Sequence, residues 1–95
     1  MVGIGITACE GNGSQDVIGI GNQAMKNNSG DYSAGIGFQA GFNNTGINTN
    51  AIGLGAGNTN TGTTCNFFGL NTGTNNTGNF VNAIGGSAAS TNNLS

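Results

Sequence analysis

The 95-residue sequence has no proline, no histidine and no tryptophan, and it carries only one basic and three acidic side chains. A single basic residue cannot neutralise a run of phosphates, so nucleic-acid binding lacks its principal source of affinity. Two cysteines without a histidine cannot assemble an ordinary zinc site, and three carboxylates are too few for a dense calcium-binding array. We therefore expect no nucleic-acid partner, no metal and no other cofactor.

Long apolar runs are also missing. No stretch of the sequence approaches the roughly 18 apolar residues that a membrane-spanning helix needs, so we expect no membrane insertion by this segment. The N-terminus shows no basic region followed by an apolar stretch, so no signal peptide is visible. The chain offers neither a paired set of carboxylates nor a nucleophile with a base, and we expect it not to be an enzyme.

Small residues dominate what is present, and they repeat with a fixed period. Glycine, asparagine, threonine and serine make up more than half of the chain, which on composition alone is typical of low-complexity sequence. Written in rows of 16, however, the chain aligns with itself from end to end without an insertion. Column 5 is Gly and column 12 is Asn in every row, while column 4 is Ile and column 8 is Ala with one exception each. This phase indicates a repeat architecture rather than disorder.

The period favours a β-solenoid. Sixteen residues are too few for a helical pair, which needs about 33 or more, and Gly and Asn are poor helix formers. They suit one coil made of two short strands and two tight turns. We predict an all-β fold, a parallel β-solenoid (β-roll) of six 16-residue coils that form one domain over residues 1–95. The predicted coils are 1–16, 17–32, 33–48, 49–64, 65–80 and 81–95. At about 4.8 Å per coil, the rod would be about 29 Å long.

Columns 2, 4, 6 and 8 are apolar or small and alternate with columns 3, 5 and 7, which is the period of a strand. We interpret these even columns as the face that points into the core. The centre of the predicted core is column 4, which consists of Ile4, Ile20, Ile36, Ile52, Phe68 and Ile84.

Column 5 consists entirely of glycine: Gly5, Gly21, Gly37, Gly53, Gly69 and Gly85. Glycine permits the close approach of another backbone. The column therefore predicts a packing face for a neighbouring chain, or a local requirement of a tight coil, or a mixture of the two.

Column 12 consists entirely of asparagine: Asn12, Asn28, Asn44, Asn60, Asn76 and Asn92. Asn44, Asn60 and Asn76 begin an Asn-Thr-Gly sequence, and both Asn and Gly tolerate left-handed turn conformations. Identical amides stacked one coil apart can also hydrogen-bond along the axis as a ladder. The turn role and the ladder role are compatible.

The 16-residue coil also predicts how the cysteines, and the charged residues Glu10 and Lys26, lie relative to one another. Cys9 and Cys65 lie three and a half coils apart, about 17 Å along the axis, whereas a disulfide requires Cα atoms within about 7 Å. An intrachain disulfide is thus excluded, which leaves buried free thiols or interchain bonds. Glu10 and Lys26 share column 10 on adjacent coils, where we expect an exposed ion pair worth about 0–1 kcal/mol.

Two surface patterns remain. The sequence N-x-S/T marks candidate glycosylation sites at Asn12, Asn27, Asn43, Asn75 and Asn93. Column 13 carries Thr45, Thr61 and Thr77, and such rows of threonine on a flat solenoid resemble ice-binding surfaces.

Neither terminal row of the sequence has the polar character of a solenoid cap, so the strand edges at both ends of the rod are open to pairing with another chain. This favours a slice of a longer rod or a subunit that stacks end to end.

The row consensus N-x-A-I-G-L-x-A-G-x-N-N-T-G resembles the head repeats of trimeric autotransporter adhesins. It also resembles related repeats in bacterial surface proteins and in phage or viral fibres. The resemblance covers essentially the whole chain and is carried by residues 38–46, 50–56 and 82–85 and by the Asn-Thr-Gly turns. It implies a left-handed parallel β-roll, three chains side by side, and an adhesive role outside the cell.

From these features we expect a non-enzymatic structural component of an extracellular fibre or filament, at a cell surface or on a virion, with an adhesive role. It would assemble through the solenoid ends, the Gly-rich lateral face, or both. The expected partners are the chain itself, as a homotrimer or an end-to-end filament, and host-surface or matrix ligands. The alternative is a ligand-binding solenoid that recognises ice or surface glycans.

Overall fold

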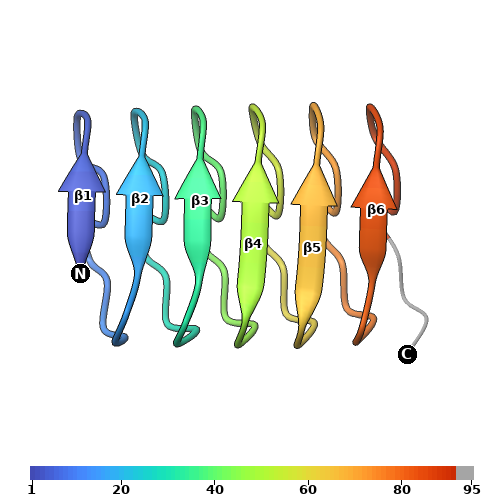
Figure 1. Cartoon of the computed structure of the whole chain (residues 1–95), viewed down its shortest axis with the longest axis horizontal. Helices are drawn as coiled ribbons and strands as arrows, with labels where there is room; N and C mark the ends of the chain where they lie inside the picture. The colour runs from blue at the N-terminus through green and yellow to red at the C-terminus, as the bar shows by residue number, and fades with distance from the viewer. Residues whose placement is uncertain (92–95) are drawn as a thin grey trace.

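A computed structural model of the chain describes residues 1–91. Within them six strands form one parallel sheet in sequence order (Figure 1). The strands are β1 (Val2–Ile4), β2 (Ile18–Ile20), β3 (Ala34–Ile36), β4 (Thr49–Ile52), β5 (Cys65–Phe68) and β6 (Asn82–Ile84). Paired residues lie 16 positions apart, as Ile4 and Ile20 do, and no helix occurs in this part of the chain. The predicted all-β parallel solenoid with a 16-residue coil is confirmed.

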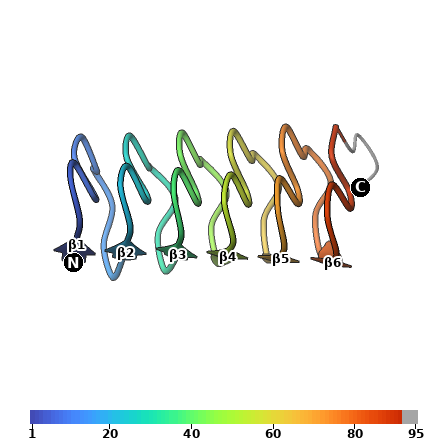
Figure 2. The ribbon, with the colours of Figure 1, turned by 90° about the horizontal axis from the view of Figure 1, so that it is seen from above.

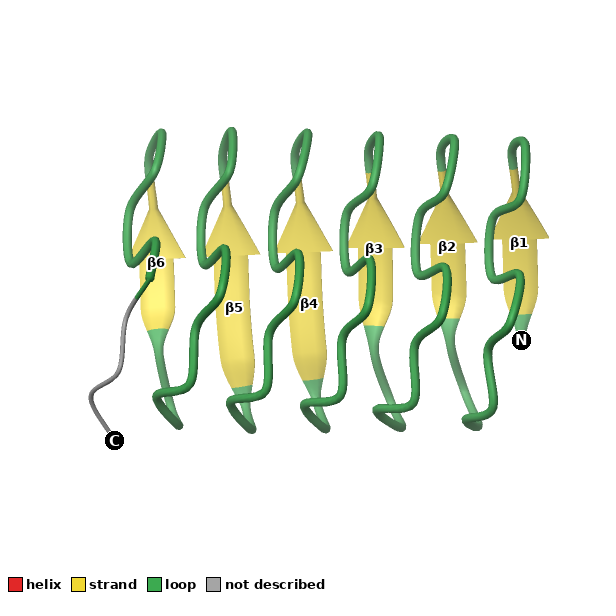
Figure 3. Cartoon of the chain, turned by 180° about the vertical axis from the view of Figure 1, so that it is seen from behind, coloured by secondary structure: helices red, strands yellow, loops and turns green. Residues whose placement is uncertain are grey.

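Each coil contains one strand rather than the two that we predicted. The strand lies on one side of the rod, and the chain returns along the other side through a series of turns (Figures 2 and 3). The return path cannot be a strand because alternate residues adopt left-handed conformations, with φ of 61° at Gln23, 53° at Met25 and 56° at Asn27. It is nevertheless bonded to both neighbouring coils. The Met25 amide donates to the Ala40 carbonyl, and the Asn27 amide donates to the Glu10 carbonyl, each at 2.8 Å.

The rod measures 30 × 21 × 14 Å between Cα atoms. Its length agrees with the roughly 29 Å expected from six coils at the strand spacing. Its thickness leaves little interior space, since the side chains of both walls must fit within it. Small residues therefore line the inside, among them the column-8 residues Ala24, Ala40, Ala56 and Thr72, all fully buried.

The prediction that column 4 forms the core is wrong. Ile4, Ile20, Ile36, Ile52, Phe68 and Ile84 lie on the outer face of the sheet and are between 37% and 80% exposed. The inward positions of the strands are columns 1 and 3, where Val17, Thr49, Ala51 and Phe67 are buried. A branched side chain in every coil would not fit between walls so close together, whereas the outer face accepts one in every coil.

Two large side chains do lie inside, and each faces glycine. A Cβ atom on Gly35 would lie 2.7 Å from the Met25 sulfur, and one on Gly41 would also meet that atom. A Cβ atom on Gly73 would meet the ring of Phe67 in the same way. Glycines in columns 3 and 9 thus provide the space that Met25 and Phe67 fill, and the interior stays closely packed.

The column-5 glycines meet a requirement of the tight coil itself, as one of the readings above predicted, while their role as a packing face for another chain remains a prediction. Their φ angles lie between 124° and 137°, and a Cβ atom on Gly21 would lie 2.7 Å from the Gly37 carbonyl oxygen. Gly5, Gly37 and Gly53 meet the following coil in the same way. The close approach is therefore between consecutive coils of one chain. At Gly85, in the last coil, a Cβ atom would meet nothing within 4 Å.

Candidate assembly surfaces

The column-12 asparagines form a hydrogen-bonded ladder along the inside of the rod. Each side-chain amide nitrogen donates to the side-chain oxygen of the asparagine one coil earlier. The bonds run from Asn28 to Asn12, Asn44 to Asn28, Asn60 to Asn44 and Asn76 to Asn60, with lengths of 2.8, 2.7, 2.8 and 2.8 Å. All four donor residues are at most 1% exposed. The ladder prediction is confirmed for these residues, and Asn92 lies outside the described part of the chain.

The same amides also hold the turns, as Asn60 illustrates. Its Nδ2 donates to the Gly62 carbonyl at 2.8 Å and to the Thr49 hydroxyl at 3.0 Å. Its Oδ1 accepts the Gly62 amide at 3.1 Å in addition to the amide of Asn76. A buried amide has a high desolvation cost unless it is hydrogen-bonded, so this network fixes each coil in register with the next.

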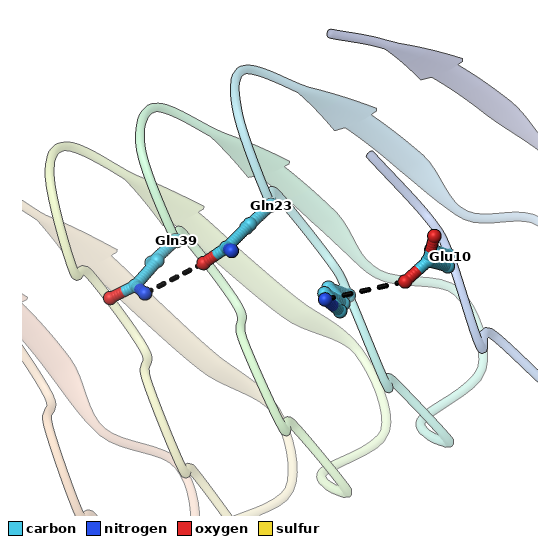
Figure 4. Close-up of polar contacts among 4 residues, drawn as sticks. Glu10, Gln23 and Gln39 are labelled. Atoms are coloured by element: carbon cyan, nitrogen blue, oxygen red, sulfur yellow. Dashed lines mark hydrogen bonds and ion pairs between the residues drawn. The ribbon is translucent and has the colours of Figure 1, made fainter. Parts of the chain in front are cut away.

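Further rows of like residues run along the surface. Asn50 donates to Asn66 at 2.9 Å and Asn66 donates to Asn82 at 2.8 Å. Gln39 donates to Gln23 at 2.7 Å on the opposite side of the coil (Figure 4). The asparagine bonds are exposed, so each replaces a bond to water and adds little stability, whereas the glutamine bond is partly buried.

The predicted ion pair between Glu10 and Lys26 is confirmed. The Lys26 Nζ lies 3.3 Å from the Glu10 Oε1, and the two side chains are 23% and 58% exposed. The Glu10 end of this contact is labelled in Figure 4. At such exposure the pair contributes about 0–1 kcal/mol.

Both cysteines are free and buried, in agreement with the exclusion of an intrachain disulfide. The Cys65 thiol donates to the Gly78 carbonyl at 3.3 Å, and its sulfur accepts the Asn76 amide at 3.5 Å. Burial raises the pKa of the Cys9 thiol above its ordinary value. Since the thiolate is the reactive form, Cys9 is a weak nucleophile at neutral pH.

The candidate glycosylation sites differ in their surroundings. Asn27 and Asn75 are exposed and Asn43 is half-buried. The Asn12 amide nitrogen, to which a glycan would be attached, donates instead to the Ser14 carbonyl at 3.1 Å. Asn93 lies outside the described residues. The glycosylation prediction remains a prediction.

The largest feature of the outer surface is a band that we call the apolar stripe. It consists of twelve side chains on the outer face of the sheet and in the residues that follow β1, β3, β4 and β5, between 37% and 80% exposed. They are Val2, Ile4, Ile6, Ile18, Ile20, Ile36, Phe38, Ile52, Leu54, Phe68, Leu70 and Ile84. None carries a charge. Sequence reasoning found these columns but assigned them to the interior.

The two ends of the rod form the other candidate surfaces. Along the rod, the amides of Val2 and Cys9 donate forward to the next coil, and the amides of Gly21 and Gln23 donate back to the previous one. The first-coil amides that correspond to those of Gly21 and Gln23 face one end of the rod. The last-coil amides that correspond to those of Val2 and Cys9 face the other end, beside the open space at Gly85. The ends thus present the groups by which coils join one another.

Several kinds of site are not found in residues 1–91. They contain no group of three or more His, Cys, Asp or Glu side chains arranged to hold a metal ion. Neither a pocket nor a helix long and apolar enough to cross a membrane is found in this range. Comparison with known proteins returned no matching family model, no matching curated protein and no matching solved structure.

Proposed function

We propose that this chain is a non-enzymatic structural component of an extracellular fibre or filament. One observation carries the proposal: each coil is joined to the next by the same parallel strand, the same bonded return path and the same buried amide. Such a structure extends along one axis only and is quasi-one-dimensional. A structural rod requires such repetition of one unit along one axis.

The end faces support continued stacking. A further coil placed on either end would find donors and acceptors in the pattern that joins coils within the rod. That coil can belong to the same protein or to another copy. Stacking between copies would be head-to-tail, and a head-to-tail contact without closure produces an open filament.

The thin interior supports association as well. Small domains bury too little apolar surface for a large stability margin, and here most buried side chains are Ala, Gly or Asn. Apart from Val17, Met25 and Phe67, most of the large apolar residues are exposed. Contacts between copies would bury them and increase the stability of the folded chain.

The adhesive role and the location outside the cell rest on the resemblance of the repeat to adhesin heads and to phage or viral fibres. In this proposal the rod is displayed at a cell surface or on a virion, where its amide rows meet host-surface or matrix ligands. The row of Gln23 and Gln39, on the opposite side of the coil from the strands' asparagines, offers hydrogen-bonding groups at the coil spacing.

Electron microscopy of the 95-residue protein over a range of concentrations tests the structural proposal. We expect rods or fibres that lengthen in steps of about one 30 Å rod. A field of separate particles no longer than one rod at every concentration would contradict it. Retention on immobilised matrix proteins, with bovine serum albumin as the control surface, tests the adhesive part.

A ligand-binding function is the second candidate, and one observation favours it. Thr45, Thr61 and Thr77 are all exposed, one per coil, and form a row of hydroxyl and methyl groups along the rod. Thermal hysteresis at micromolar protein would support ice binding, and its absence would remove that version.

A further inference from the structure

We propose that the apolar stripe is the surface on which a second copy of this chain lies alongside the first. The proposal rests on the self-association in the proposed function. It assigns the lateral contact to a surface distinct from the rod ends.

The size of the stripe argues for a protein partner. Twelve side chains, each exposed by 37% to 80%, present on the order of 1,000 Å² if the whole accessible area of such a residue is about 200 Å². The largest apolar patch on a typical monomer is about 300–600 Å². A specific protein interface of standard size buries about 800 Å² per partner. The stripe therefore exceeds what a monomer ordinarily leaves in water and is large enough for a stable pair.

The shape and the charge distribution of the stripe argue for a second copy. It runs along all six strands of a rod 30 Å long, so its partner must be equally long, straight and uncharged. The charged residues, Glu10, Asp16, Lys26 and Asp31, all lie in the first two coils and outside the stripe. The same stripe on another copy meets these requirements, and its side chains have the same coil spacing. Two such sheet faces can interdigitate at about 10 Å, as in a β-sandwich.

A pair of charge-matched variants provides the test. In the stripe variant, Ile20→Glu and Ile52→Glu place two carboxylates on the second and fourth coils. In the control variant, Ser29→Glu and Thr61→Glu place two carboxylates on the same coils at exposed turn positions. Circular dichroism checks the fold of each protein, and light scattering gives its mass.

We expect the wild type and the control variant to have masses above that of one chain. We expect the stripe variant to dissociate at concentrations at least tenfold higher than those at which the control does. A wild type that is monomeric at all concentrations would overturn the proposal, even if it binds lipid vesicles or another protein. Equal masses for the stripe variant and the control would overturn it too.

A second variant tests the same contact without requiring that the sheet tolerate glutamate and still fold. Leu54→Asn with Leu70→Asn places asparagine in column 6, where Asn22 already stands in the second coil. The fold accepts this residue there, so we expect a folded protein with weakened lateral association. An association unchanged in this variant would contradict the proposal.

The tests also separate the lateral contact from axial stacking. Filaments that persist at reduced width in the stripe variants support the lateral contact and leave the proposed function intact. Wild-type pairs that never lengthen into filaments would count against axial growth alone.

Discussion

The buried asparagine ladder makes a quantitative prediction, which Asn60→Ala tests. Asn60 is fully buried. Its two amide hydrogens are shared among the acceptors of Asn44, Thr49 and Gly62, and its oxygen accepts from the Gly62 and Asn76 amides. Each bond contributes about 0.5–1.5 kcal/mol, and partners left unpaired in the interior add a desolvation cost. We expect Asn60→Ala to lower the free energy of unfolding by about 3–5 kcal/mol, a large part of the 5–15 kcal/mol of a typical domain.

The matched control is Asn50→Ala, which removes the same amide from the exposed row. Asn50 donates one hydrogen bond, to Asn66 at 2.9 Å, and water can replace it. We expect a loss within about 0.5 kcal/mol. Urea unfolding followed by circular dichroism at one fixed protein concentration measures both variants. With a slope of about 1 kcal/mol/M, the Asn60 midpoint should fall by about 3 M or more. Equal shifts in the two variants would refute the claim that the buried ladder holds the coils together.

Three further predictions follow from the backbone, the interior and the thiol. Thr59→Asn should raise the melting temperature by about 4 °C, because Thr59 has φ of 59° and asparagine tolerates this conformation better; an unchanged or lower value would contradict this. Gly35→Ala should lower the free energy of unfolding by about 1–3 kcal/mol because its methyl group would meet the Ala40 carbonyl oxygen and the Met25 side chain, whereas Gly86→Ala, with nothing within 4 Å, should change it by less than about 0.5 kcal/mol. The raised pKa of Cys9 favours the neutral thiol in the folded state, so the melting temperature should fall as pH rises past about 9 and should fall less in Cys9→Ala; parallel pH profiles would be the contrary result.

The coil period and the contacts along the axis could be predicted from sequence. With a period of 16 and parallel stacking, residues in the same column become neighbours. Asn44 must then lie beside Asn28, and Lys26 beside Glu10, as they do. The isolation of Cys9 from Cys65 follows from the same geometry.

The direction of the side chains could not be predicted from alternation. A strand period defines two faces without saying which is inside. The usual preference of Ile for the interior led us to assign the wrong face to the core. Steric limits prevail here, because a rod 14 Å thick between Cα atoms has room for small residues. One signal in the sequence pointed to the true interior. Columns 3 and 9 compensate in size, with Phe67 in the coil of Gly73 and Met25 in that of Gly19.

The presence of only one strand in each coil could not be predicted from the sequence for a different reason. Left-handed conformations occur on the return path at Gln23, Met25 and Thr59 as well as at glycines. Such residues adopt them only where the surrounding structure imposes it. The hydrogen bonds to both neighbouring coils impose it here, and a propensity argument applied to one coil does not include them.

The mass of the wild-type protein in native buffer tests most directly whether this chain works in association with copies of itself. Sedimentation equilibrium at several micromolar concentrations measures it against the 9.3 kDa of a single chain. We predict masses that are multiples of this value and rise with concentration as filaments grow. A stable, soluble species of 9.3 kDa at every concentration would contradict the account.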